Sequence, residues 1–156
     1  MVTTRPRGAR GIDEILGVAR ARLLRLTPEQ AFAERAGGAV LVDIRPAAQR
    51  AEHGEIPGSV IIERNHLEWR LDPGCEARLP WVARYDHRII VFCMDGYTSS
   101  LAAAALQDLG LSRATDMIDG FRAWAAAGLP TAAGGSGMVT LAPGATGISP
   151  LASGRS

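Results

Sequence analysis

Short runs of apolar residues are the clearest pattern along this chain. The strongest runs occupy residues 39–44, 60–62 and 89–92, and a weaker one occupies 114–118. Runs of this length without regular polar alternation are typical of strands that are buried on both faces of a parallel sheet. The pattern therefore predicts four strands of one parallel sheet.

Helical signals lie between these runs. The Thr-Pro-Glu-Gln stretch at 27–30 supplies an N-cap, a proline at the first position and a capping-box glutamine, so a helix should run to about Arg35. Three further helices are expected at 47 to about 52, at 98–109 and at 121–127, with only a loop between the second and third strands. Strands that alternate with helices predict an α/β domain with helices on both faces of the sheet and ligands at the carboxyl ends of the strands.

Composition narrows the class of protein. A chain of 156 residues with 47% hydrophobic and 21% charged residues is long enough and apolar enough to fold as one globular domain. The formal net charge of +1 gives no overall field for holding nucleic acid, and no stretch approaches the roughly 18 apolar residues of a membrane-spanning helix. Two cysteines exclude a disulfide-dense secreted scaffold. We therefore expect a cytoplasmic domain with no nucleic-acid or membrane partner.

The two ends of the chain differ from its middle. Six arginines and two acids fall in the first 25 residues, where apolar residues recur at helical intervals from Ile12 to Leu24. This spacing excludes a secretory signal and favours a basic amphipathic helix packed on the domain, with a helix on a membrane surface or an anionic partner as the alternative. From 131 to 156, 20 of 26 residues are Gly, Ala, Ser, Pro or Thr. We expect a helical extension over 1–26, a domain over 27–130 and a flexible tail over 131–156.

One cysteine lies where the chemistry of a parallel sheet is expected. Cys93 directly follows the third strand, Gly96 lies in the loop after it, and Thr98 begins an Ala-rich helix. Unpaired amides and the positive end of a helix dipole favour the thiolate form of a nearby thiol. Gly96 would let the loop amides turn toward the sulfur, and the hydroxyls of Thr98 and Ser99 would cap the helix and donate to the same anion. These residues predict a nucleophilic thiolate, although a cysteine at a strand end can also be a small buried hydrophobe.

Four motifs stand in register across the same part of the chain. They are LVDIR at 41–45, HGEIPGSVI at 53–61, IIVFCMDGYT at 89–98 and IDGFRAWAAAGLP at 118–130. Together they resemble the rhodanese-like (sulfurtransferase) domain over about 27–130. The resemblance implies a three-layer α/β domain with a central parallel sheet and a six-residue active-site loop that begins at the catalytic Cys93. It also implies that this thiolate takes a sulfane sulfur from a small-molecule donor as a persulfide and passes it to a thiol or cyanide acceptor, without a cofactor, a protein acceptor being a further option.

The same resemblance points to the residues around the substrate. The candidate substrate-binding residues of the loop are Met94, Asp95, Gly96, Tyr97, Thr98 and Ser99. Asp95 stands where thiosulfate-using members often carry a basic residue, and a carboxylate there should repel a dianionic donor. Arg64 and Arg70 follow the second strand and are candidates for supplying the missing positive charge. The departure leaves open a catalytically weak rhodanese-like binding or sulfur-relay module.

A phosphatase is a less suitable interpretation of the same loop. Related cysteine phosphatases end a longer loop in an arginine six positions after the cysteine, where this chain has Ser99. Such an enzyme would lack its principal phosphate ligand.

Other polar residues are expected to be structural. Asp43 and Arg45, at the end of the first strand, should form an ion pair. The three histidines and two cysteines show no metal-ligand spacing, so no metal site is predicted. Cys75 lies in an Asp-Pro-Gly-Cys turn, where it is either an incidental thiol or a partner that takes over a persulfide from Cys93.

Overall fold

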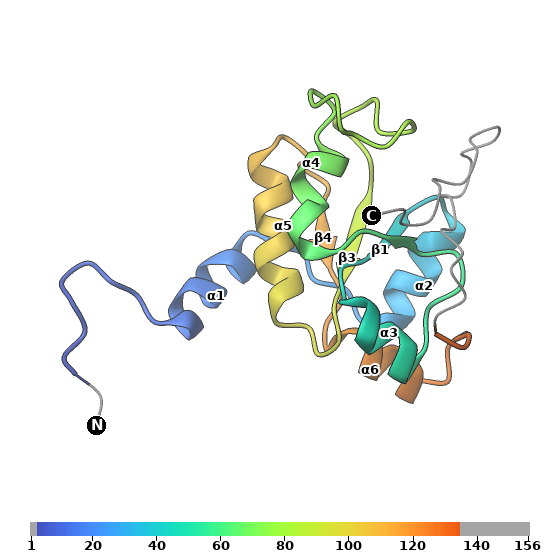
Figure 1. Ribbon diagram of the computed structural model, residues 1–156, viewed down its shortest axis with the longest axis horizontal. Helices are drawn as coiled ribbons and strands as arrows, with labels where there is room; N and C mark the ends of the chain where they lie inside the picture. Colours follow the sequence, from blue (N-terminus) through green and yellow to red (C-terminus); the bar gives the residue numbers. More distant parts are fainter. Residues whose placement is uncertain (1–2, 135–156) are drawn as a thin grey trace.

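The computed structural model describes residues 3–134. Helices and strands alternate along most of this range (Figure 1). The helices are α1 (Ile12–Ala21), α2 (Pro28–Ala36), α3 (Ala47–His53), the 3₁₀ helix η1 (Arg64–His66), α4 (Leu67–Leu71), α5 (Thr98–Asp108) and α6 (Gly120–Ala126). The strands are β1 (Val40–Asp43), β2 (Val60–Ile61), β3 (Ile89–Phe92) and β4 (Thr115–Asp116). The four predicted strands, and the helices predicted before, between and after them, are all present.

The four strands form one parallel sheet in the order β2-β1-β3-β4. The two central strands pair along their whole length, from Val40 with Ile89 to Asp43 with Phe92, and every residue of both strands is buried. Each edge strand is only two residues long. Complete burial of β1 and β3 explains why their sequences show no polar alternation.

Helices cover both faces of the sheet and make three layers (Figure 1). Because side chains alternate along a strand, each central strand contributes side chains to two separate cores. The core on one face joins the sheet to α4 and α5 and includes Val42, Val91, Leu67, Leu71, Ala102 and Leu106. The core on the other face joins the sheet to α2 and α6 and includes Leu41, Ile90, Phe92, Ala31, Phe121 and Trp124. The predicted three-layer α/β fold is confirmed.

The segment between β2 and β3 is not the simple loop that the sequence predicts. The chain forms η1 and α4 there before it turns toward β3. Leu67 and Leu71 lie four residues apart on one face of α4 and are fully buried in the core that α5 shares. Two leucines among charged residues make too short a pattern to predict a five-residue helix, because burial of α4 depends on the helix that it covers.

The N-terminal segment lies at one side of the domain, where α1 runs beside α5 (Figure 1). Leu16 and Ala19 of α1 are buried, whereas Ile12 and Val18 are exposed. Just after α1, Arg22 forms an ion pair of 2.6 Å with Asp108 at the end of α5. The segment is therefore joined to the domain by an apolar stripe and by charged contacts.

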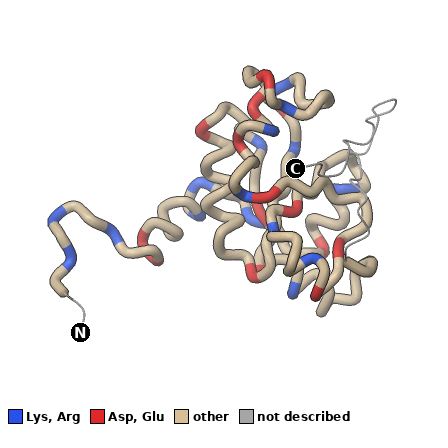
Figure 2. The backbone as a smooth tube through the Cα atoms, viewed as in Figure 1, with Lys and Arg blue, Asp and Glu red and all other residues tan. Residues whose placement is uncertain are grey.

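Beyond α6 the chain returns to the segment that follows α3. Trp124 Nε1 donates to the carbonyl of Pro130 at 2.8 Å, and Ala132 exchanges two backbone hydrogen bonds with Glu55. The rest of the predicted tail, 135–156, lies outside the described residues. Figure 2 shows basic and acidic residues interspersed over the domain, with basic residues more frequent in the N-terminal segment. No helix between residues 3 and 134 is long and apolar enough to cross a membrane.

Candidate active site

Cys93 lies at the carboxyl edge of the sheet, directly after β3. Since β3 has β1 on one side and β4 on the other, the loop that follows it opens at the centre of this edge. The cysteine is only 5% exposed, and α5 begins five residues later at Thr98. The sequence-based placement of the cysteine between a central strand and a helix is confirmed.

Two backbone amides contact the sulfur. The N–H of Gly96 donates to Cys93 Sγ at 3.2 Å, and the N–H of Ser99 donates to the same atom at 3.4 Å. Gly96 has a φ of +83°, and a Cβ at this position would lie 2.5 Å from the backbone nitrogen of Asp119. Both the backbone conformation and the close approach therefore require glycine here. The loop thus places oriented N–H dipoles where a negative charge on sulfur would be stabilised.

The start of α6 is hydrogen-bonded to the backbone of the loop. The amide of Phe121 donates to the carbonyl of Cys93 at 2.8 Å, and the amide of Arg122 donates to the carbonyl of Met94 at 3.1 Å. Gly120 has a φ of +59°, and a Cβ there would lie 2.3 Å from the carbonyl oxygen of Cys93. The backbones of the loop and α6 are thus in direct contact, and α6 holds the backbone of Cys93 in place.

The side chains of the predicted loop residues point in different directions. Tyr97 and Thr98 are exposed, whereas Met94 is buried in the core shared with α6, with its sulfur 3.7 Å from Arg45 Nη1. No side chain caps α5, so the expected capping by Thr98 and Ser99 is wrong. The Ser99 hydroxyl also does not serve the loop anion as expected, because it donates to Asp116 Oδ2 at 2.8 Å. The loop reaches the sulfur through its backbone.

Arg64 and Arg70 are engaged away from the loop. Arg64 Nη1 donates to Glu68 Oε1 at 2.6 Å, an ion pair between residues four apart in η1 and α4. Arg70 Nη1 donates to the carbonyl of Ala77 at 2.7 Å. Both arginines follow β2 in sequence, but the helical turn that follows β2 directs them to local partners.

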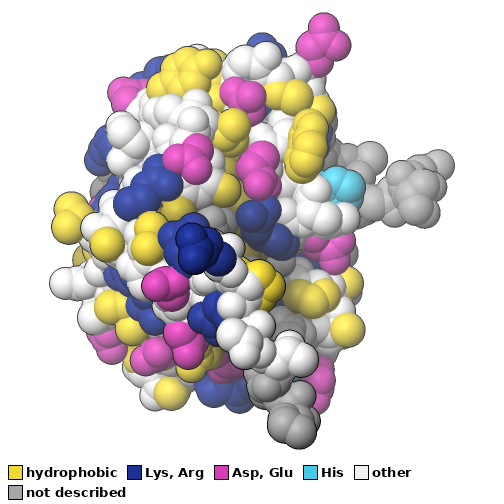
Figure 3. All heavy atoms as spheres, turned by 90° about the vertical axis from the view of Figure 1, so that its left-hand side faces the viewer, with side chains coloured by type: hydrophobic (Ala, Val, Ile, Leu, Met, Phe, Trp, Pro, Cys, Tyr) yellow, Lys and Arg dark blue, Asp and Glu magenta, His cyan; other side chains and the backbone are white. Residues whose placement is uncertain are grey.

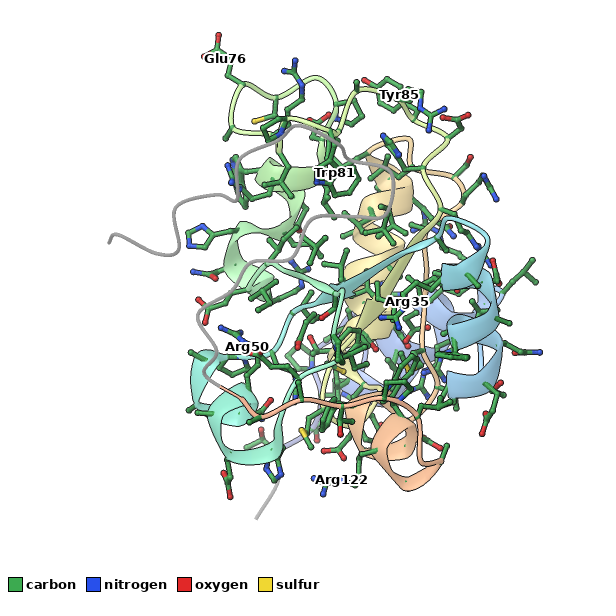
Figure 4. All side chains as sticks on the ribbon, turned by 90° about the vertical axis from the view of Figure 1, so that its right-hand side faces the viewer. Arg35, Arg50, Glu76, Trp81, Tyr85 and Arg122 are labelled. Carbon is green, nitrogen blue, oxygen red and sulfur yellow. The ribbon has the colours of Figure 1, made fainter. Side chains whose placement is uncertain are left out.

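An ion pair instead joins the loop to α6. Arg122 Nε donates to Asp95 Oδ1 at 2.7 Å, and both side chains are about half exposed or more. The hydrogen bond to Asp95 raises the pKa of Arg122 above its usual value. A pocket of about 460 Å³ lies beside them, lined by Asp95, Tyr97, Asp119, Arg122, Ala123 and Ala126. Figure 4 shows Arg122 on α6, pointing away from the sheet.

Two arginines of the N-terminal basic segment, which were not among the candidate site residues, also reach the loop. Arg20, at the end of α1, and Arg25, which follows it, both donate to the carbonyl of Gly96, at 2.8 and 3.0 Å. Figure 3 views the face covered by the N-terminal segment and shows arginines gathered across its middle among acidic side chains. The one sequence signal for this contact was Asp116, an acid in the fourth strand, which pairs with Arg25 at 2.9 Å.

The remaining candidates lie away from the loop amides that contact the Cys93 sulfur. Asp43 and Arg45 form the predicted ion pair, both fully buried, with Arg45 Nη2 2.8 Å from Asp43 Oδ2 and the guanidinium 4.1 Å above the ring of Phe121. Cys75 lies in a turn, where its amide donates to the carbonyl of Asp72 at 3.0 Å, and its thiol is free. Within residues 3–134, no group of three or more histidines, cysteines or acids could hold a metal ion.

Comparison with known proteins assigns the chain to a family. Residues 27–127 match the family described as the rhodanese-like domain. The thiosulfate sulfurtransferase GlpE of Stutzerimonas stutzeri is 40% identical over 100 residues, which cover 64% of this chain and 83% of that protein. GlpE of Haemophilus influenzae strain PittEE is 30% identical over 105 residues, which cover 67% of this chain and 90% of that protein.

Two solved structures share the fold of this chain. A Rhodopseudomonas palustris protein of unknown function, named as a possible tyrosine phosphatase, is 33% identical with a TM-score of 0.74, over 83% of this chain and 100% of that chain. A rhodanese-related protein from Thermoplasma volcanium, at 22% identity, has the same fold with a TM-score of 0.54, over 69% of this chain and 96% of that chain. With a family match that spans well over half of its length, the chain belongs to the rhodanese-like domain family.

Proposed function

We propose that this protein is a sulfurtransferase that moves a sulfane sulfur from a small donor to a thiol or cyanide through a persulfide on Cys93. The observation that carries the proposal is the sulfur of Cys93 under two loop amides at the start of α5. The family and the relatives named thiosulfate sulfurtransferase support it. With thiosulfate as donor, the reaction has two steps and needs no external oxidant or cofactor.

In the first step, the Cys93 thiolate attacks the outer sulfur of the donor. A bond forms between the cysteine sulfur and that outer sulfur, while the bond between the two donor sulfurs breaks and its electron pair leaves with sulfite. In the second step, the acceptor attacks the terminal sulfur of the persulfide, and the electron pair of the broken bond restores the Cys93 thiolate. Cyanide as acceptor gives thiocyanate. Each step is a nucleophilic displacement at sulfur, as in other covalent catalysis.

The loop is suited to hold the charge during both steps. The amides of Gly96 and Ser99 face the sulfur in the resting protein, so they need little rearrangement when charge develops there. We assign the donor-binding role to the backbone of the loop from Asp95 to Ser99, with Tyr97 as an exposed wall. The first turn of α5 leaves further amides without helical partners for the same anion.

The ion pair between Asp95 and Arg122 bears on the choice of donor. Asp95 alone would repel thiosulfate, but Arg122 at 2.7 Å compensates its charge. Arg122, rather than the predicted Arg64 or Arg70, thereby supplies the positive charge beside the loop. We propose that thiosulfate and low-molecular-weight persulfides both reach Cys93, past a mouth whose charge is balanced. The free thiols of Cys75 and Cys93 fit a reducing compartment such as the cytoplasm.

A tyrosine phosphatase activity, suggested by the name of the Rhodopseudomonas neighbour, is not favoured here. At the position where a phosphatase carries its phosphate-binding arginine, this chain has Ser99, whose hydroxyl is bonded to the buried carboxylate of Asp116. An anion in this loop would therefore be bound by backbone amides, and the loop itself has no arginine to bind it with two parallel hydrogen bonds.

Steady-state kinetics with the full chain test the proposal. Thiosulfate, 3-mercaptopyruvate and a glutathione persulfide are compared as donors, with cyanide or a thiol as acceptor. The expected result is turnover with ping-pong kinetics for at least one donor, abolished in Cys93→Ser and retained in Cys75→Ser. Turnover that survives in Cys93→Ser would contradict the proposal. Absence of turnover with every donor would also contradict it and would favour a binding module.

A further inference from the structure

The N-terminal segment, which lies outside the part of the chain that matches the family, reaches into the active-site loop. Arg20 Nη2 donates to the carbonyl of Gly96 at 2.8 Å, and Arg25 Nη2 donates to the same oxygen at 3.0 Å. Two guanidinium groups from a segment more than 70 residues away thus converge on one peptide group. That peptide group follows the amide that contacts the nucleophile.

The same two arginines continue into a buried network under the loop. Arg25 Nε donates to Asp116 Oδ1 at 2.9 Å. Arg20 Nε donates to the Ser100 hydroxyl at 3.1 Å, and that hydroxyl donates to Asp116 Oδ2 at 2.8 Å. The Ser99 hydroxyl donates to the same carboxylate oxygen at 2.8 Å. Asp116 and both serines are fully buried, so the network is shielded from water and its hydrogen bonds gain strength.

From this network we infer that Arg20 and Arg25 are positioning residues that hold the loop amides against the Cys93 sulfur, an inference that rests on the proposed function of that sulfur. Both amides that contact Sγ belong to residues anchored by the network: Gly96 through its carbonyl, and Ser99 through its hydroxyl. Glycine has the most conformational freedom of any residue in the loop. The hydrogen bonds to the Gly96 carbonyl restrict that freedom and so hold the Gly96 N–H in the direction of the sulfur.

The charges of the network, like the loop amides, stabilise a negative charge on the Cys93 sulfur. Arg20 and Arg25 carry two positive charges against the single carboxylate of Asp116, which leaves a net positive charge behind the loop. Arg20 also lies 5.7 Å above the ring of Tyr97, the residue after Gly96. A positive charge behind the oriented amides favours a thiolate or persulfide anion on Cys93 over the neutral form. The N-terminal segment therefore adds two positive charges and two hydrogen bonds to a loop that belongs to the family-matching part of the chain.

A nearby arginine provides a matched control. Arg22 lies on the same segment and forms an ion pair with Asp108, but it contacts α5 far from the loop, at an exposed surface. Loss of this pair weakens only the docking of the N-terminal segment. A variant at Arg22 thus separates general loosening of the segment from loss of the contact with Gly96.

The experiment compares Arg20→Gln, Arg25→Lys and Arg22→Gln in the full chain carrying Cys75→Ser. Lysine at position 25 keeps a positive charge beside the buried Asp116. Arg20→Gln leaves Asp116 paired with Arg25, so Arg20→Gln should retain its fold and test the inference even if Arg25→Lys does not fold. The pH profile of Cys93 alkylation by iodoacetamide is the first readout, and kcat and KM for sulfur transfer are the second.

The inference has a specific expected outcome. Alkylation at neutral pH should slow by about three- to tenfold in Arg20→Gln and Arg25→Lys, with the profile moved toward alkaline pH. The kcat for sulfur transfer should fall in the same two variants, while Arg22→Gln should match the parent in both readouts. Profiles of Arg20→Gln and Arg22→Gln that coincide with the parent would overturn the inference.

Alkylation needs no sulfur donor, so the two proposals fail separately. A parent protein without turnover, whose alkylation nevertheless slows in Arg20→Gln, would overturn the proposed function and support the positioning role. Normal turnover with unchanged alkylation profiles would overturn the positioning role alone.

Discussion

Substitution of Gly120 by alanine tests whether α6 sets the position of the nucleophile. The new methyl group would lie 2.3 Å from the carbonyl oxygen of Cys93 and 2.8 Å from that of Met94. All of these atoms belong to backbone, so no side chain can rotate away. Normal contact requires about 3.4 Å, and the loop must therefore move by about 1 Å relative to α6.

The expected effect has two parts. Alanine at a positive φ costs about 1 kcal/mol of folding free energy at either Gly120 or Gly128. Overpacking against the loop adds about 1–3 kcal/mol at Gly120 alone, because a Cβ at Gly128 has no heavy atom within 4 Å among the described residues. A displacement of about 1 Å at the reacting atom should lower kcat/KM for sulfur transfer by about 100-fold.

The assay pairs Gly120→Ala with Gly128→Ala, whose φ values are +59° and +74°. Urea unfolding gives the stability of each variant, and steady-state kinetics give kcat/KM. Gly128→Ala should lose about 1 kcal/mol and retain its activity. If Gly120→Ala unfolds and turns over like Gly128→Ala, the contact between α6 and the loop does not position Cys93.

Three further outcomes follow from other parts of the structure. Arg45→Met leaves the buried Asp43 carboxylate unpaired and should destabilise the fold by about 3–5 kcal/mol in urea unfolding, and a loss below about 1 kcal/mol would contradict a structural ion pair. Burial lowers the pKa of His87 below its usual 6.5, with the charge of a nearby arginine as a smaller cause. The unfolded chain therefore takes up this proton first as pH falls, so stability present above about pH 6.5 is lost below it. His87→Phe should flatten that loss between about pH 6.5 and 5, measured by urea unfolding at several pH values, and an unchanged slope would contradict it. Asp95→Asn should free Arg122 for an anionic donor and lower KM for thiosulfate with little change in kcat, whereas a raised KM would show that the ion pair itself organises the mouth.

The sequence predicts the sheet well because burial leaves a local trace. β1 and β3 are buried on both faces, so they appear as continuous apolar runs. The start of α2 is equally local: Thr27 Oγ1 accepts from the Gln30 amide at 3.2 Å, and Gln30 Oε1 accepts from the Thr27 amide at 2.9 Å, as the predicted capping box requires. Cys93 follows from the same logic, since a strand end and a helix start are both visible in the sequence.

The partners of long charged side chains are not predictable in the same way. The position of Arg64 and Arg70 after a strand predicts that they lie at the site, but the structure pairs Arg64 with Glu68, at the spacing of one helical turn. Of these partners, only Glu68 is visible in the local sequence. Arg20 and Arg25 reach Gly96 because α1 packs beside α5, a contact between distant parts of the chain. The bond from Ser99 to Asp116 likewise depends on the neighbouring positions of β3 and β4.

Intact-mass and peptide mass spectrometry after incubation with thiosulfate tests the central claim most directly. The protein, mixed with donor in the absence of acceptor, should gain about 32 Da, the mass of one sulfur atom, on the peptide that contains Cys93. Addition of cyanide should remove this mass and release thiocyanate, and Cys93→Ser should never acquire it. A chain that gains no sulfur on Cys93 from thiosulfate or from any persulfide donor would contradict the account.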